Sequence, residues 1–206
     1  MKTNYHITSS GAKYVIASVN KTPAAIDSNQ SLLLYFLKQK INGAIAFSDI
    51  LNHFNNDKPL AFKKITQLIS LQLIDINEPE TENLEPINTS NEYFLDSIKT
   101  DDNYLFVDLN GFPISYCGFN QQQAISISSV AYDYIKASSR SRNETENNSL
   151  QTPRSIKTSW SDFDIIICLL YLENFSCLLI TKNTHFMDSN EFINLASYLC
   201  NRYNYE

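Results

Sequence analysis

The sequence predicts an α/β protein of the α+β kind, built from two domains. Helical spacing of apolar residues dominates the first part of the chain, whereas a hairpin signal and three later apolar runs indicate an antiparallel sheet. The charge is divided in the same way: residues 1–77 hold 8 Lys and Arg against 4 Asp and Glu, and residues 78–206 hold 8 against 18, so +4 and −10 make the total of −6. We therefore expect one domain over residues 1–77, an acidic linker or wing over 78–90, and a second domain over 91–206.

Three helices are expected in the first domain. Residues 13–19 read as a short strand or extended lead-in, and residues 29–41 carry a broad apolar stripe at helical spacing. A second helix follows Phe47, and a third begins near Pro59, a residue suited to the first helical position. The leucine- and isoleucine-rich run 71–76 predicts a strand that leads into a wing.

This order over about residues 28–90 resembles the winged helix-turn-helix family. In that family the third helix enters the DNA major groove, so the resemblance implies that Lys63, Lys64 and Gln67 occupy the reading face. The other interpretation of these residues is a plain solvated helix face. The helix is poor in arginine, and the segment from Glu78 to Glu85 is acidic where phosphates would lie, which opposes an affinity that rests on phosphate neutralisation. We therefore expect this face to contact protein rather than nucleic acid.

The second domain is expected to be arranged around a hairpin at residues 104–118. Asn110 and Gly111 join two runs rich in β-branched and aromatic residues, and this pair predicts a type I′ turn because both residues tolerate positive φ. Pro113 has no backbone N–H, so its strand is expected at a sheet edge. Asp108 is expected to accept hydrogen bonds from turn amides rather than to act as an acid catalyst.

Helices and strands alternate around this hairpin. A short helix at 91–99 precedes it, a long helix from about Gln121 to Ala137 follows it, and residues 138–153 predict a mobile loop of low complexity. A closing helix, capped by Ser189, ends the domain. The three strands expected between loop and closing helix are residues 155–161, 164–171 and 175–181.

Residues 106–118, FVDLNGFPISYCG, resemble the hairpin motif V-D-x-x-G-x-P-I-x-x-x-G of the roadblock (dynein light-chain) family. The order helix, hairpin, helix, three strands and helix over about residues 90–203 is similar to the profilin-like fold of that family. The resemblance implies a roadblock-type domain with a five-stranded antiparallel sheet flanked by helices.

Roadblock domains pair through their long second helix and the edge strand after the loop, so the resemblance also implies a dimer. In this chain those elements are the helix around residues 127–135 and the strand 155–161. Trp160 is either a core residue or an interface anchor, and its place near the end of an edge strand favours the anchor. The predicted interface residues are Ile127, Val130, Ala131, Tyr134, Ile156, Thr158 and Trp160.

No residue pattern supports catalysis, a cofactor or a metal. The four cysteines form no C-x-x-C pair and three of them lie inside apolar runs, so we expect buried, reduced thiols. His6, His53 and His185 are equally scattered, and Asp162 and Asp164 read as solvated turn acids. No apolar run approaches the roughly 18 residues that cross a bilayer, and the N-terminus is polar. We expect a cytoplasmic protein without a membrane span.

Two functions remain as hypotheses. The first is a non-enzymatic, dimeric scaffold or regulator of a small Ras-like GTPase or comparable protein partner, since many roadblock proteins bind such GTPases and act by remodelling them. The alternative is a dimeric DNA-binding transcriptional regulator, in which the roadblock half dimerises and the winged helix reads DNA. An enzyme has no support from any residue.

Overall fold

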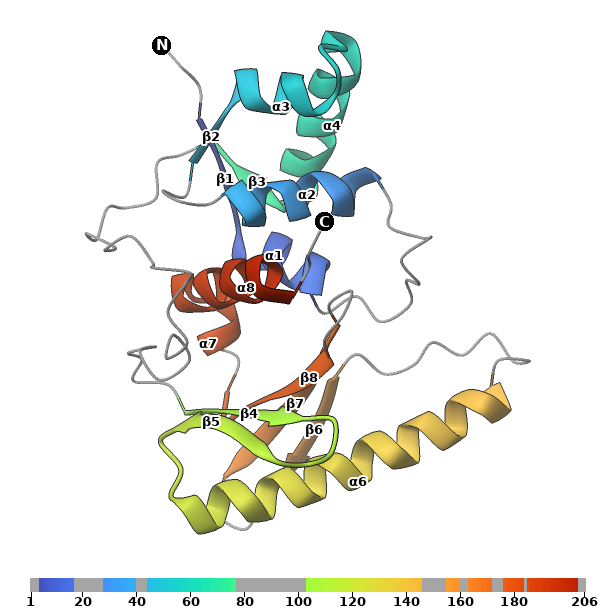
Figure 1. The fold of residues 1–206 in the computed structure, drawn as a ribbon, viewed down its shortest axis with the longest axis vertical. Coiled ribbons are helices and arrows are strands. Elements are labelled where there is room, and N and C mark those ends of the chain that lie inside the picture. Colours follow the sequence, from blue (N-terminus) through green and yellow to red (C-terminus); the bar gives the residue numbers. More distant parts are fainter. Residues whose placement is uncertain are drawn as a thin grey trace. The chain divides into compact units, whose positions relative to one another are not determined.

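The protein has the expected α+β architecture, with an N-terminal part of helices and a small sheet and a five-stranded antiparallel sheet further along the chain. It divides into two compact units, which are described separately (Figure 1). The computed structural model describes residues 4–16, 28–39, 44–76, 103–145, 155–159, 163–171, 176–183 and 185–203.

The first unit packs helices around a three-stranded sheet. In chain order its elements are β1 (Asn4–Ile7), α1 (Ser9–Ile16), α2 (Ser28–Gln39), β2 (Ala44–Ala46), α3 (Phe47–His53), α4 (Lys58–Ser70), β3 (Ile74–Asp75) and, from the far end of the chain, α8 (Asn190–Tyr203).

The sheet order is β2-β1-β3, and β1 pairs antiparallel with both neighbours. The middle strand of this sheet therefore comes from the N-terminus. A winged helix would place a strand of the wing hairpin after β3, and the predicted linker or wing at 78–90 lies outside the described residues.

The expectation of a strand or extended lead-in at residues 13–19 was wrong where the structure describes it, because residues up to Ile16 belong to α1. Thr8 begins this helix: its side-chain oxygen accepts a hydrogen bond from the Gly11 amide at 3.1 Å, and its carbonyl accepts one from the Ala12 amide at 2.9 Å. The buried residues of α1 then recur at helical spacing. Val15 and Ile16 pack instead on the buried side of this helix.

Helix α8 packs against α1 and α2. The Ser197 hydroxyl donates a hydrogen bond of 2.7 Å to the carbonyl of Leu37, one of the last four carbonyls of α2, which have no partner within their own helix. Asn201 donates a second, longer bond of 3.4 Å to the same carbonyl. The closing helix, which the sequence analysis placed with the sheet in residues 91–206, thus belongs to the first compact unit.

The second unit is organised by its sheet, whose neighbouring strands are all antiparallel. The strand order is β5-β4-β8-β7-β6, so β5 and β6 are the two edges. The predicted strands are confirmed to within two residues, and the edge position expected from Pro113 is confirmed as well. The strands are β4 (Tyr104–Asp108), β5 (Pro113–Cys117), β6 (Ser155–Ser159), β7 (Asp164–Tyr171) and β8 (Ser176–Thr181).

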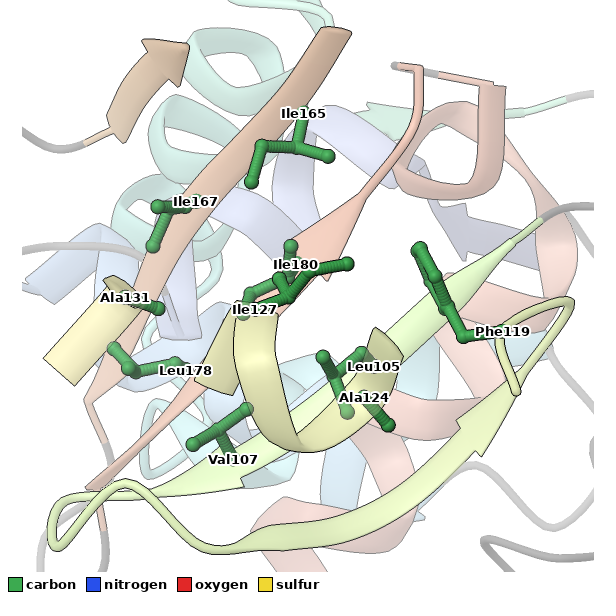
Figure 2. Packing of buried hydrophobic residues seen from close by; sticks show 10 residues of the cluster. All are labelled: Leu105, Val107, Phe119, Ala124, Ile127, Ala131, Ile165, Ile167, Leu178 and Ile180. Carbon is green, nitrogen blue, oxygen red and sulfur yellow. The ribbon is translucent and has the colours of Figure 1, made fainter. Parts of the chain in front are cut away.

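Helix α6 (Gln121–Thr145) covers one face of this sheet. Asn120 and Gln123 form a reciprocal cap, in which each side-chain oxygen accepts the backbone N–H of the other residue, at 2.8 and 3.0 Å. Figure 2 shows Ile127 directed at Ile180 and Ala131 close to Leu178, with strand residues of β4, β7 and β8 completing the cluster. This apolar layer fixes α6 on the sheet.

The long helix continues past its apolar stripe. We expected it to end near Ala137 and a mobile loop to begin at 138, but α6 runs to Thr145, so the loop prediction was wrong for residues 138–145. Once a helix has nucleated, each further residue adds one backbone hydrogen bond, which extends α6 beyond the end of the apolar stripe. The predicted helix at 91–99 lies outside the described residues. A short helix, α7 (His185–Asp188), follows β8, and its Phe186 ring stacks on Tyr104 of β4 with centroids 5.3 Å apart.

Candidate protein-binding surfaces

The hairpin between β4 and β5 is held by Asp108. Its carboxylate accepts the backbone N–H of Asn110 at 2.9 Å and that of Phe112 at 2.8 Å, and its carbonyl accepts the Gly111 amide at 3.1 Å. This confirms the expectation that Asp108 accepts hydrogen bonds from the amides of its turn. The predicted type I′ turn was wrong, because Gly111 has φ of +86° whereas Asn110 is not in the positive-φ region. The aspartate side chain bonds supply the closure that two positive-φ residues would otherwise provide.

Five exposed apolar side chains gather around this hairpin, and we call them the hairpin surface. All are between 41% and 67% exposed, which is unusual for residues of this size. The hairpin surface consists of Leu109, Phe112, Ile114, Tyr116 and Ile125.

Strand register and helix geometry place two of these residues, Tyr116 and Ile125, on the side of the sheet that α6 covers. Tyr116 lies opposite Leu105, whose side chain belongs to the core beneath α6, so the Tyr116 side chain is on the same sheet face as α6. Gly111 lies against Tyr132 of α6, because a Cβ added to that glycine would be 3.0 Å from the Tyr132 Cβ. Ile125 and Tyr132 are seven positions apart and therefore project from the same side of the helix, toward the hairpin.

The opposite flank of α6 carries the predicted interface. Val130 and Tyr134 each lie two positions from Tyr132, which turns them by about 200° and away from the hairpin. Val130 is half-buried and Tyr134 is 37% exposed. These two residues remain available for the predicted contact.

The other predicted interface residues have different surroundings. Ile127 and Ala131 are buried in the core between α6 and the sheet, and Ile156 packs against that core from β6. Thr158 is half-buried on β6, and Trp160 lies outside the described residues. Part of the apolar stripe of α6 thus packs on the sheet of the same chain.

Strand β6 is a polar edge. Ser155, Lys157 and Ser159 are exposed, and the Lys157 ammonium is 2.8 Å from the Asp164 carboxylate on β7. Hydrogen bonds from the side chains of Lys157 and Ser159, together with the charge of Lys157, lower the pKa of Asp164. A lysine on an edge strand opposes pairing with another chain when its charge is unpaired, whereas Lys157 is already paired with Asp164.

The predicted partner or DNA face on α4 is only partly open. Lys63 and Gln67 are exposed, whereas the Lys64 ammonium donates a hydrogen bond of 3.2 Å to the side chain of Asn29 in α2. Phe62, which the sequence analysis did not single out, is 49% exposed, and its ring packs on Phe47 at a centroid distance of 4.7 Å. The exposed face of α4 therefore combines positive charge with an aromatic side chain.

All four cysteines are free thiols, and Cys168, Cys177 and Cys200 are buried as expected. Burial raises the pKa of Cys177 and that of Cys200 to about 12, which keeps both thiols protonated and unreactive at neutral pH. Burial also lowers the pKa of His53, whose ring lies 4.7 Å from that of Tyr35. Among the described residues no group of three or more His, Cys, Asp or Glu side chains is placed to hold a metal ion. No helix in the described part of the chain is long and apolar enough to cross a membrane.

No family model matches the chain, and no curated protein matches it. The candidate surfaces are therefore inferred from the residues of this chain alone. Sequence reasoning missed the hairpin surface because it judged each apolar residue by its periodicity. A second signal was present: from Leu109 to Tyr132 the sequence contains no charged residue.

Proposed function

We propose that the chain is a non-enzymatic, homodimeric scaffold or regulator that binds a small Ras-like GTPase or a comparable protein partner. The observation that carries the proposal is the outer flank of α6, where Val130 and Tyr134 remain outside the subunit's own core on the side of the helix turned away from the hairpin. A helix that fills its sheet with one stripe and keeps apolar side chains beside it is typical of a subunit that pairs with another.

A two-fold contact suits this arrangement. An isologous interface brings the same surface of two subunits together, so one axis can join helix α6 to its copy and edge strand β6 to its copy. The short, polar β6 contributes backbone donors and acceptors, while Val130 and Tyr134 contribute apolar area. Lys157 lies on this edge and is paired within its own subunit, so it need not be buried without a partner.

The class of partner comes from the resemblance of residues 106–118 to roadblock domains. Such domains hold or remodel a GTPase and need no catalytic residue of their own. Asp108, the one carboxylate inside that motif, is engaged by the amides of its own turn. This role agrees with a binding module.

The dimer is tested by light scattering on the full chain, because α8 belongs to the first unit and a C-terminal fragment would separate it from α1 and α2. Val130→Glu should weaken the dimer at least tenfold, since an unpaired charge inside an interface cannot be hydrated. Thr66→Glu is the matched control, because it adds the same charge at an exposed position of α4. A wild-type chain that stays monomeric at high micromolar concentration would refute the dimer.

The partner is tested with a purified small Ras-like GTPase from the same source, loaded with a fluorescent guanine nucleotide. The proposal expects saturable binding, read as fluorescence anisotropy, and a changed rate of nucleotide exchange or hydrolysis. Binding that fails for every such GTPase tested would leave the dimer standing but remove this partner class.

A DNA-binding regulator is the second candidate, supported by α4, which carries Lys58, Lys63 and Lys64 and no acidic residue. We expect a gel-shift titration to show only non-specific affinity, about 10⁻⁴ to 10⁻⁶ M at physiological salt. The exposed Phe62 and the engagement of Lys64 by Asn29 favour a protein contact at this face. Nanomolar, sequence-dependent binding that is lost in Lys63→Glu/Lys64→Glu would instead establish the DNA-binding function.

A further inference from the structure

We propose that the hairpin surface is a second self-association site, at which two copies of this chain meet independently of the contact through α6 and β6. Three features of the described residues carry this inference: the exposure of its apolar side chains, the strand edge beneath them and the absence of charge.

The first feature is the exposure of the apolar side chains. Phe112 is 67% exposed and Ile125 53% exposed, and both keep their backbones in well-defined local structure, a side-chain-closed turn and a helix. The exposed parts of the five side chains amount to on the order of 400 Å² of apolar area. A stable interface buries about 800 Å² on each partner, so this surface alone supports a weak contact that forms at high concentration.

Strand β5 supplies the geometry. It is an edge of the sheet and carries Ile114 and Tyr116 of the hairpin surface. Two such edges can lie antiparallel across a two-fold axis, which places each hairpin surface against the other. Pro113 and the irregular register between Phe106 and Val107 restrict the length of backbone that can pair, so side-chain contact would dominate.

The distribution of charge along the chain favours a second copy of the chain as the partner at the hairpin surface. The chain has a net charge of −6, and residues 78–206 alone carry −10, so two copies that approach through most of this part of the chain bring like charges together. The stretch from Leu109 to Tyr132 contributes no charge to this repulsion. A charged partner would lose hydration there without gaining an ion pair, whereas a second copy brings an identical uncharged surface.

The test is sedimentation equilibrium on the full chain from about 10 µM to about 1 mM, a range that brackets weak dissociation constants. The variant Phe112→Glu/Ile125→Glu places two charges on exposed side chains and leaves the Asp108 turn and the core intact. Its matched control is Asn52→Glu/Thr66→Glu, which adds the same charge at exposed positions of the first unit. This pair separates the loss of a contact from a general rise in repulsion.

If the inference holds, the wild-type mass rises beyond that of a dimer with concentration and the hairpin variant stops at a dimer. Val130→Glu then still forms a dimer through the hairpin surface, and the combination of Val130→Glu with the hairpin variant is monomeric. The inference is overturned if the hairpin variant and the wild type give the same mass at every concentration, or if wild type never exceeds a dimer that Val130→Glu abolishes. That second result would leave the proposed dimer intact, so the two proposals fail in different ways.

A third result would assign the surface to another protein. If self-association is unchanged in Phe112→Glu/Ile125→Glu but the affinity for the purified GTPase falls at least tenfold, the hairpin surface belongs to the partner. The self-association proposal would then be wrong.

Discussion

Helices α6 and α8 have similar sequence patterns but lie in different environments. Both carry apolar residues at helical spacing, yet α6 buries a single stripe against its sheet, whereas the residues of α8 from Leu195 to Cys200 are all buried. Part of that burial comes from α1 and α2 of the first unit. An apolar stripe therefore predicts a helix, whereas the number of elements packed against that helix determines how much of its surface is buried.

Removal of α8 should have the largest effect on the structure of the first unit. A chain that stops after residue 186 should lose the native structure of the first unit, because Leu33, Phe36 and Leu37 of α2 are buried in the unit that α8 completes. Amide NMR signals of α1 and α2 should collapse toward random-coil positions. Removal of residues 204–206 alone is the control, and unchanged signals in the long truncation would show that the first unit folds without α8.

The next largest difference should appear when one side chain is replaced in each helix. Phe192→Ala in α8 should lower the free energy of unfolding by about 3–5 kcal/mol, because it opens a cavity at a fully buried position. Ile125→Ala in α6 removes an exposed side chain and should change that free energy by no more than about 0.5 kcal/mol. Urea unfolding measures both, and equal losses would contradict the difference in burial.

The hydrogen bond from α8 to the end of α2 should have a smaller effect. Ser197→Ala leaves the Leu37 carbonyl with only the longer bond from Asn201, so we expect a loss of about 1 kcal/mol in the free energy of unfolding. Ser129→Ala changes the same residue type at an exposed position of α6 and should stay within about 0.5 kcal/mol of wild type. A loss at Ser197 no greater than at Ser129 would argue against this bond as a fastening of α8.

The smallest effect concerns pH and the thiol of Cys200. Burial raises its pKa from 9.0 to about 12, so the unfolded chain gives up this proton at a lower pH than the folded chain does. The protonated Cys200 thiol therefore contributes its full stabilisation of the folded state below about pH 9, and this contribution declines as the pH rises above that value. In thermal melts between pH 8 and pH 10, Cys200→Ala should therefore lose less stability with rising pH than the wild type does. Ser129→Ala, at an exposed position of α6 that carries no ionisable side chain, serves as the control that should follow the wild-type slope.

Much of the second unit could be predicted from the sequence. The alternation, turn residues and apolar runs between residues 104 and 181 predicted each strand of the sheet to within two residues, because strand existence depends on local patterns. The role of Asp108 followed from its place before a turn. The turn type did not, because an aspartate side chain and one positive-φ glycine close the loop in a way that the Asn-Gly pair alone does not reveal.

The candidate surfaces were predicted less completely. Apolar residues of α6 looked alike in the sequence, and only the sheet beneath the helix separates the buried Ile127 and Ala131 from the outward Val130 and Tyr134. The hairpin surface required strand register and the position of Gly111 against Tyr132 before its members could be recognised as neighbours.

What the sequence by itself determined was local: the secondary structure of most elements, the antiparallel sheet, the free buried cysteines and the uncharged stretch after Asp108. These depend on period, propensity and composition within short windows of chain. Only the tertiary structure decided that β1 occupies the middle of the first sheet and that α8 joins α1 and α2. The contact of α8 joins residues 160 positions apart, Leu37 and Ser197, and the apolar area and unpaired carbonyls that select such partners are visible only once both elements have formed.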